Sequence, residues 1–177
     1  GVGLLLSQWA RHLGARVIGC VGSEEKAELA RANGCEHTIL YRHEDIPGKV
    51  REFTDGDGVA AVYDSVGKAT FMDSLDSLRP FGVMVSYGNA SGPVEPFSPG
   101  ILAPRGSLYV TRPTLASHIA TRDLLEDGAN RLFAAVTDGM LHIQINQRYP
   151  LSETAQAHRD LEARKTTGST VLIAGSA

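Results

Sequence analysis

The first three residues, Gly1-Val2-Gly3, lead directly into a segment at residues 4–13 whose apolar side chains recur at helical spacing. An apolar run typical of a buried strand follows at residues 15–21. Glycines at the entry to such a helix are typical of a pyrophosphate-binding turn, because a side chain would block the close approach of the ligand. The alternative is a flexible chain end. The order of helix and strand favours the binding turn, in which the helix N-terminus faces the anion.

The strand predicted at residues 15–21 ends without the acidic residue that binds the ribose 2′-hydroxyl of NAD in many dinucleotide-binding proteins. Instead, the hydroxyl of Ser23 follows, and Lys26 lies about one helical turn further along. This arrangement leaves room for a 2′-phosphate with which Lys26 can pair, so it favours NADPH over NADH. Glu24 and Glu25 weaken the preference, although carboxylates also suit the positive end of a helix dipole.

Strands and helices alternate along most of the remaining chain. We predict helices at 24–33, 46–54, 69–78 and 122–137, and strands at 37–40, 59–64, 82–87 and 107–110. This alternation predicts an α/β fold with a doubly wound parallel sheet, a Rossmann domain, at residues 1–140. Because the chain begins at the first helix, we expect the first strand of that sheet to be missing.

The pattern changes in the last part of the chain. We predict an alternating segment around Ile143 and Ile145, a helix N-capped by Ser152 that reaches Ala163, and a terminal strand at 168–174. These elements do not extend the earlier alternation. We therefore expect residues 141–177 to form a segment that returns to a neighbouring catalytic domain.

The composition narrows the classes of partner. The formal net charge is -3, with 17 basic and 20 acidic residues spread along the chain, so neither nucleic acid nor an anionic membrane is an expected partner. No apolar stretch approaches the ~20 residues that span a bilayer. The two cysteines, Cys20 and Cys35, form no CxxC pair, so we expect no metal site and a reducing, cytoplasmic location.

The chain resembles the zinc-independent NADPH:quinone oxidoreductases of the medium-chain dehydrogenase superfamily, the group that includes zeta-crystallin. The resemblance runs through essentially the whole chain and is carried by the segments GVGLLLSQWARHLGARVIG, VGSEEK, VYDSVG, VSYGNASGPV, GSLYVTRP and RYPLSETAQAHRDLEAR. It implies that the phosphate-binding turn begins upstream of Gly1. It also implies that this chain is a fragment without the N-terminal GroES-like domain.

The resemblance further implies a set of cofactor contacts. They are Val2 and Gly3 at the pyrophosphate, Ser23, Lys26 and Tyr41 around the adenosine 2′-phosphate, Ser65, Tyr87, Gly88, Asn89 and Arg112 near the following strand ends, and Arg164 at a phosphate. Several have plain alternatives, since Tyr41 can cap the sheet, Lys26 can be a solvated charge and Asn89 is an ordinary turn former. Arg112 can equally be a surface residue. No residue is identified as the proton donor.

By the same resemblance, the intact protein is expected to transfer a hydride from NADPH to a quinone-like acceptor without zinc. Two alternatives stay open: an enoyl or alkenal reductase of the same superfamily, and a non-catalytic nucleotide-binding or interaction module. The family also implies a homodimer formed through the edge strand at Tyr109–Arg112, whose alternative is a short protected edge. We expect this chain alone to bind NADPH weakly and to turn over no quinone.

Overall fold

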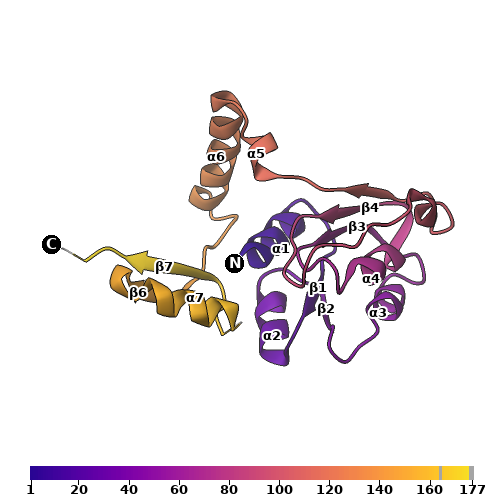
Figure 1. Cartoon of the computed structure of the whole chain (residues 1–177), viewed down its shortest axis with the longest axis horizontal. Coiled ribbons are helices and arrows are strands. Elements are labelled where there is room, and N and C mark those ends of the chain that lie inside the picture. Colours follow the sequence, from indigo (N-terminus) through magenta and orange to yellow (C-terminus); the bar gives the residue numbers. More distant parts are fainter. Residues whose placement is uncertain (164, 176–177) are drawn as a thin grey trace.

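The structure is a computed structural model in which residues 1–163 and 165–175 are described (Figure 1). Helices and strands alternate along it, as predicted. In chain order the elements are α1 Val2–His12, β1 Ile18–Val21, α2 Glu24–Ala32, β2 His37–Leu40, α3 Ile46–Phe53, β3 Val59–Asp64, α4 Phe71–Asp76, β4 Leu78–Ser86, η1 Pro99–Leu102, β5 Tyr109–Thr111, α5 Leu115–His118, α6 Arg122–Thr137, β6 Ile145–Pro150, η2 Leu151–Glu153, α7 Thr154–Glu162 and β7 Ser169–Ile173.

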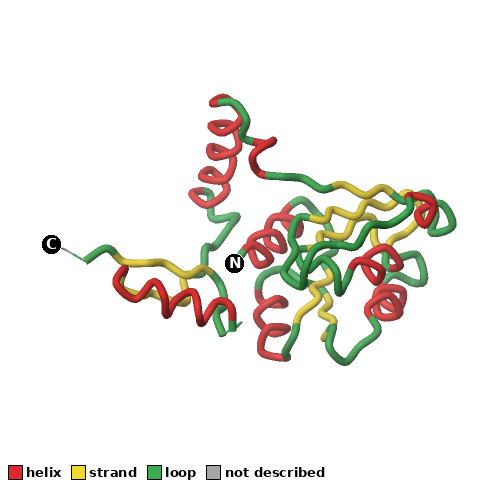
Figure 2. Tube along the Cα trace, in the orientation of Figure 1, coloured by secondary structure: helices red, strands yellow, loops and turns green. Residues whose placement is uncertain are grey.

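The strands pair in parallel, which confirms the predicted α/β class. Within the described residues up to β5, the strands form two ladders, β1–β2 and β3–β4–β5 (Figure 2). In the doubly wound order the first strand lies between the second and the fourth. If β1, β2 and β3 are taken as the second, third and fourth strands of that order, the place of the first strand is between β1 and β3, which are not hydrogen-bonded to each other among the residues that the structure describes.

A hydrophobic cluster supports the three-stranded ladder. It is formed by residues of α4, of β4 and of the segment before β5, namely Phe71, Leu75, Leu78, Met84 and Leu108. Because α4 packs its apolar side chains on β3 and β4, the loop that joins β3 to α4 is held close to the carboxyl end of the sheet. The core therefore positions the loops in which the candidate cofactor residues lie.

The region between α4 and β4 corrects one prediction. The helix ends at Asp76, and β4 begins at Leu78, so the expected start at residue 82 is wrong. The pairing register between β3 and β4 shifts after the Val59–Leu78 pair, and β4 bulges around Pro80. Pro80 is tolerated in the bulge because its missing backbone N–H is not needed for pairing with β3. Phe81 has a positive φ there, and its backbone N–H donates to the Gly106 carbonyl at 2.8 Å.

The final segment forms a small unit of its own, with β6 and β7 paired in parallel and α7 packed beside them (Figure 1). The predicted N-cap at Ser152 is wrong, because Leu151–Glu153 is a 3-10 turn and α7 begins only at Thr154. The Thr154 hydroxyl donates to the Leu151 carbonyl at 2.6 Å, which stabilises that turn in place of a serine cap.

Side-chain hydrogen bonds join this final segment to the first helices. The Gln8 amide donates to the Asn33 side-chain oxygen at 2.8 Å and accepts from the His142 backbone N–H at 2.7 Å. The Gln144 amide also donates to Asn33, at 3.1 Å. In the described part of the chain no helix is both long and apolar enough to cross a membrane.

Candidate cofactor-binding edge

The N-terminal turn of α1 presents the backbone N–H groups of Val2 and Gly3. Gly1 is its N-cap, no side chain caps it among the described residues, and its first turn contains no acidic residue. Val2 and Gly3 are both exposed, and a Cβ atom added to Gly3 would meet nothing within 4 Å. The free amides and the helix dipole of this 11-residue helix suit an anion. The predicted pyrophosphate contacts, Val2 and Gly3, therefore lie at a helix N-terminus.

Lys26 lies close to this helix terminus. Burial and, to a smaller extent, the Lys26 charge lower the pKa of the Gly1 amine. The lysine belongs to α2, whose N-cap is Ser23, and the Lys26 backbone N–H donates to the Ser23 hydroxyl at 3.4 Å. The Lys26 charge therefore adds to the positive potential at the start of α1.

Tyr41 lies over the end of β1. Its backbone N–H donates to the Val21 carbonyl at 3.1 Å, which continues the β1–β2 ladder. A Cβ atom on Gly22 would lie 3.0 Å from the Tyr41 hydroxyl oxygen, so the ring and the bare backbone are in close contact. The structure thus brings Tyr41 next to the turn that leads to Ser23.

The loops that follow β3 and β4 interlock. The Ala90 backbone N–H donates to the Ser65 carbonyl at 3.1 Å, and the Tyr87 N–H donates to the Asp64 carbonyl at 2.8 Å. A Cβ atom on Gly88 would overlap the Ser65 carbonyl oxygen. Four predicted cofactor residues, Ser65, Tyr87, Gly88 and Asn89, are therefore gathered in two loops that touch through their backbones.

Arg112 makes contacts that the sequence did not predict. Its guanidinium donates to the Ser86 carbonyl at 2.8 Å and to the Gly88 carbonyl at 3.4 Å. The side chain thus holds the carboxyl end of β4, and any contact with a cofactor would have to come from its remaining N–H groups. Arg164 lies outside the described residues.

Sequence reasoning missed the group that organises these loops. Asp64 is buried at the end of β3, and its carboxylate accepts hydrogen bonds from Thr70 and Ser74, at 2.7 and 2.8 Å. The available signal was an aspartate that ends an apolar strand and is followed by a Ser-Val-Gly turn, because such an aspartate readily accepts from backbone groups two or three residues on.

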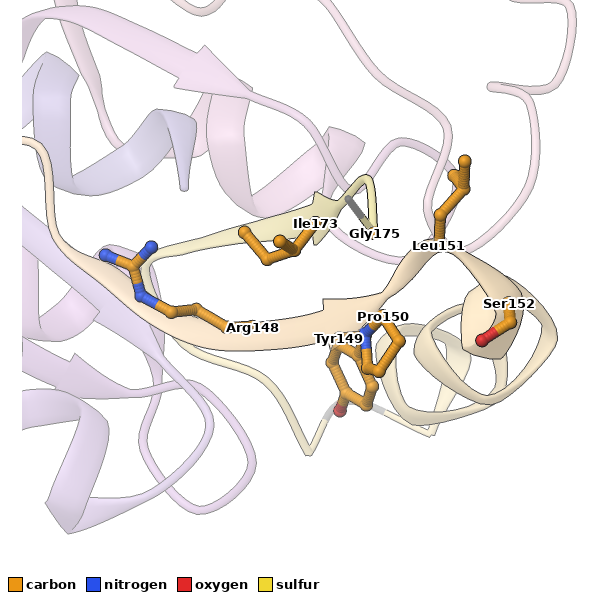
Figure 3. A pocket seen from close by; sticks show the side chains of 7 residues that line it. All are labelled: Arg148, Tyr149, Pro150, Leu151, Ser152, Ile173 and Gly175. Atoms are coloured by element: carbon orange, nitrogen blue, oxygen red, sulfur yellow. The ribbon is translucent and has the colours of Figure 1, made fainter. Parts of the chain in front are cut away.

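A separate hollow lies on the final segment, between β6 and the end of β7 (Figure 3). Its lining residues are Arg148, Tyr149, Pro150, Leu151, Ser152, Ile173 and Gly175. None of them is a predicted cofactor residue. Tyr149 instead donates its hydroxyl to Asp160 of α7 at 3.0 Å, and this hydrogen bond is the main reason why the pKa of Tyr149 is raised.

The edge fits a dinucleotide phosphate better than a metal ion. Gly3 leaves open backbone at the start of α1, and α1 and Lys26 supply positive potential. Among the described residues, no three His, Cys, Asp or Glu side chains gather in a way that could hold a metal ion. Open backbone amides and positive potential at a helix N-terminus are chemically suited to a phosphate group.

Comparison with known proteins identifies relatives of the whole chain. Residues 1–129 match the family described as zinc-binding dehydrogenase. A quinone oxidoreductase of Pseudomonas aeruginosa is 53% identical over 98% of this chain and 53% of its own length, and a 2-haloacrylate reductase of Burkholderia sp is 48% identical over 98% and 52%. The crystal structure of Escherichia coli quinone oxidoreductase complexed with NADPH superposes with a TM-score of 0.93 at 46% identity, over 98% of this chain and 54% of that one. The chain spans about half the length of these relatives.

We predict that Gly88→Ala destabilises the protein, because the added Cβ would force the Ser65 backbone to move and overpacking of this kind costs about 1–3 kcal/mol. Gly128→Ala in α6 is the matched control. It adds the same methyl group in open space, and it should gain about 1 kcal/mol from helix propensity. Urea unfolding of both variants measures the difference. Equal stability of Gly88→Ala and the wild type would contradict the close contact between the two loops.

Proposed function

This chain belongs to the family of zinc-binding dehydrogenases. We propose that it is the cofactor-binding part of an oxidoreductase that transfers a hydride from NADPH to a quinone or related acceptor. The observation that carries the proposal is the open backbone at the start of α1, where the Lys26 charge adds to the positive potential of the helix terminus. This arrangement matches a pyrophosphate and a 2′-phosphate. A relative of 46% identity has been solved with NADPH, which supports the choice of cofactor.

In the proposed complex the residues of this chain bind and orient the cofactor. The first amides of α1, at Val2 and Gly3, would face the pyrophosphate, and Ser23, Lys26 and Tyr41 would surround the adenosine 2′-phosphate. NADPH supplies the hydride when it is bound. A further set near the strand ends would line the rest of the cofactor; it comprises Ser65, Tyr87, Gly88, Asn89 and Arg112, and Arg164 completes the proposed contacts.

We also propose the domain division expected from the sequence, with a dinucleotide-binding domain at residues 1–140 and a returning segment at 141–177. Two features of the structure support it. Among the described residues β1 and β3 are not paired with each other, and a doubly wound sheet has its first strand at that place. The hollow on the final segment exposes apolar side chains at Leu151 and Ile173. An upstream part of the protein would supply the strand and would cover this surface.

The acceptor has a second candidate class. The 48% identity to a 2-haloacrylate reductase favours an acceptor with an activated carbon–carbon double bond. Both reactions receive the hydride from the same cofactor, so the edge described above serves either. NADPH oxidation by the full-length protein, followed with a quinone and with a haloacrylate in turn, distinguishes the two acceptors by their kcat/KM.

We further propose that the protein is cytoplasmic and that its reaction proceeds without zinc, as in the quinone oxidoreductases that the sequence resembles. A homodimer is proposed through β5. This strand pairs with β4 on one side, and among the described residues its other edge carries no strand. Tyr109 is 60% exposed on it, and an unpaired edge of this kind readily adds a strand from a second chain.

We predict that Lys26→Ala in the full-length protein weakens NADPH binding about tenfold, which corresponds to ~1.4 kcal/mol, and leaves NADH binding unchanged. The reason is that only NADPH carries the 2′-phosphate. Lys49→Ala is the matched control, since the Lys49 ammonium pairs with Glu52 within α3 at 2.7 Å. Titration of cofactor fluorescence gives both dissociation constants. Equal weakening of NADPH and NADH would count against a 2′-phosphate site at Lys26.

The proposed dimer has its own test. Tyr109→Glu places like charges near each other when two β5 strands pair, so we predict a dissociation constant of the dimer that rises about tenfold or more. Met72→Glu, at an exposed methionine of α4, adds the same charge away from β5. Analytical ultracentrifugation measures both variants. A Tyr109→Glu protein as dimeric as the wild type would exclude β5 as the interface.

A further inference from the structure

The Asp64 carboxylate is buried, with 4% of the residue exposed, and it is surrounded by donors of the following loop and of α4. One oxygen accepts from the backbone N–H groups of Val66 and Gly67, at 2.7 and 3.0 Å. The other accepts from the hydroxyls of Thr70 and Ser74, at 2.7 and 2.8 Å. All four donors are uncharged. The carboxylate therefore fixes the whole path from the end of β3 into α4.

This loop in turn holds the loop that follows β4. The Asp64 carbonyl accepts from the Tyr87 N–H at 2.8 Å, and the Val66 carbonyl accepts from both the N–H and the hydroxyl of Ser91, each at 2.8 Å. The backbones are in direct contact, because a Cβ atom on Gly67 would lie 2.6 Å from the Gly92 carbonyl oxygen. A shift of residues 65–70 must therefore shift residues 87–92.

We propose that Asp64 is a positioning residue for the cofactor: its buried carboxylate holds residues 65–70, and through them residues 87–92, in the arrangement that binds NADPH. The inference rests on the proposed function, since it takes this edge to be the cofactor site. Asp64 itself is buried behind the loops, so it acts through Ser65 and Gly88 rather than by touching the cofactor.

Two substitutions of Asp64 differ in how many of its hydrogen bonds they can keep. Asp64→Ala leaves two backbone amides and two hydroxyls without their acceptor, and buried donors of this kind are costly. Asp64→Asn keeps one oxygen for the amides of Val66 and Gly67. Its amide group can donate to the hydroxyls of Thr70 and Ser74, because hydroxyls accept as well as donate. The asparagine variant should therefore retain part of the function that alanine loses.

Two buried serines provide a matched pair. Ser74 lies within α4 and is 7% exposed, and Ser77 is the C-cap residue of the same helix and is 2% exposed. The Ser74 hydroxyl donates to Asp64, whereas the Ser77 hydroxyl donates to the Asp73 carbonyl at 2.6 Å, within α4. Ser74→Ala and Ser77→Ala thus each remove one buried hydrogen bond, but only the first removes a bond to the positioning carboxylate.

The test measures the NADPH dissociation constant and the Tm of the full-length protein for these four variants. We predict that Ser74→Ala raises the dissociation constant about fivefold and that Ser77→Ala, with a similar loss of Tm, leaves it within about twofold. Asp64→Ala should raise it more than about tenfold, with Asp64→Asn in between. The serine pair decides the question even if Asp64→Ala does not fold.

Two contrary results have different meanings. If Ser74→Ala and Ser77→Ala change NADPH affinity equally, Asp64 has no positioning role, and the proposed function stands. If the wild-type protein does not bind NADPH at all, the proposed function fails, and the inference about Asp64 fails with it. Binding by the wild type therefore separates the two cases before any variant is compared.

Discussion

A carboxylate removed from water must find hydrogen-bond donors or lose its charge, and Asp64 meets this demand at the end of β3. Two backbone amides and two hydroxyls converge on it, so the chain turns from strand to helix along a single path. The core beneath the turn, with Leu75 and Met84 fully buried, keeps α4 and β4 from moving away. The arrangement of the loops at the carboxyl end of the sheet depends on that one buried carboxylate.

Close backbone approach is the second constraint, and it acts at the same edge. Gly88 lies against Ser65, and Gly22 lies against Tyr41, so a side chain at either glycine would displace a neighbour. Gly3 differs, because the space around it is open. Gly22 and Gly88 therefore allow close packing of the protein, while Gly3 leaves room for a ligand at the start of α1. Packing and binding thus make separate demands on one residue type.

The sequence predicted helices and strands well where an apolar pattern was bounded by an N-cap or by turn residues. Ser23 caps α2 as expected, and β2 and β3 have the predicted bounds, because apolar runs between turn residues are decided locally. The start of β4 was missed, since Pro80 is tolerated only because a bulge forms opposite β3. The Ser152 cap was displaced by a 3-10 turn. Family membership was predicted correctly from the motifs, whereas the roles of individual cofactor residues stay predictions.

The role of Asp64 and the backbone contacts of Arg112 were beyond sequence reasoning, because both depend on which loops meet in space. In the proposed complex NADPH binds at the carboxyl ends of β1, β3 and β4 and not in the hollow on the final segment. Hydrogen exchange of the full-length protein, measured by mass spectrometry with and without NADPH, tests it directly. We predict slower exchange at residues 22–26, 64–68 and 87–92 and no change at 145–151. Protection confined to 145–151 would contradict the claim.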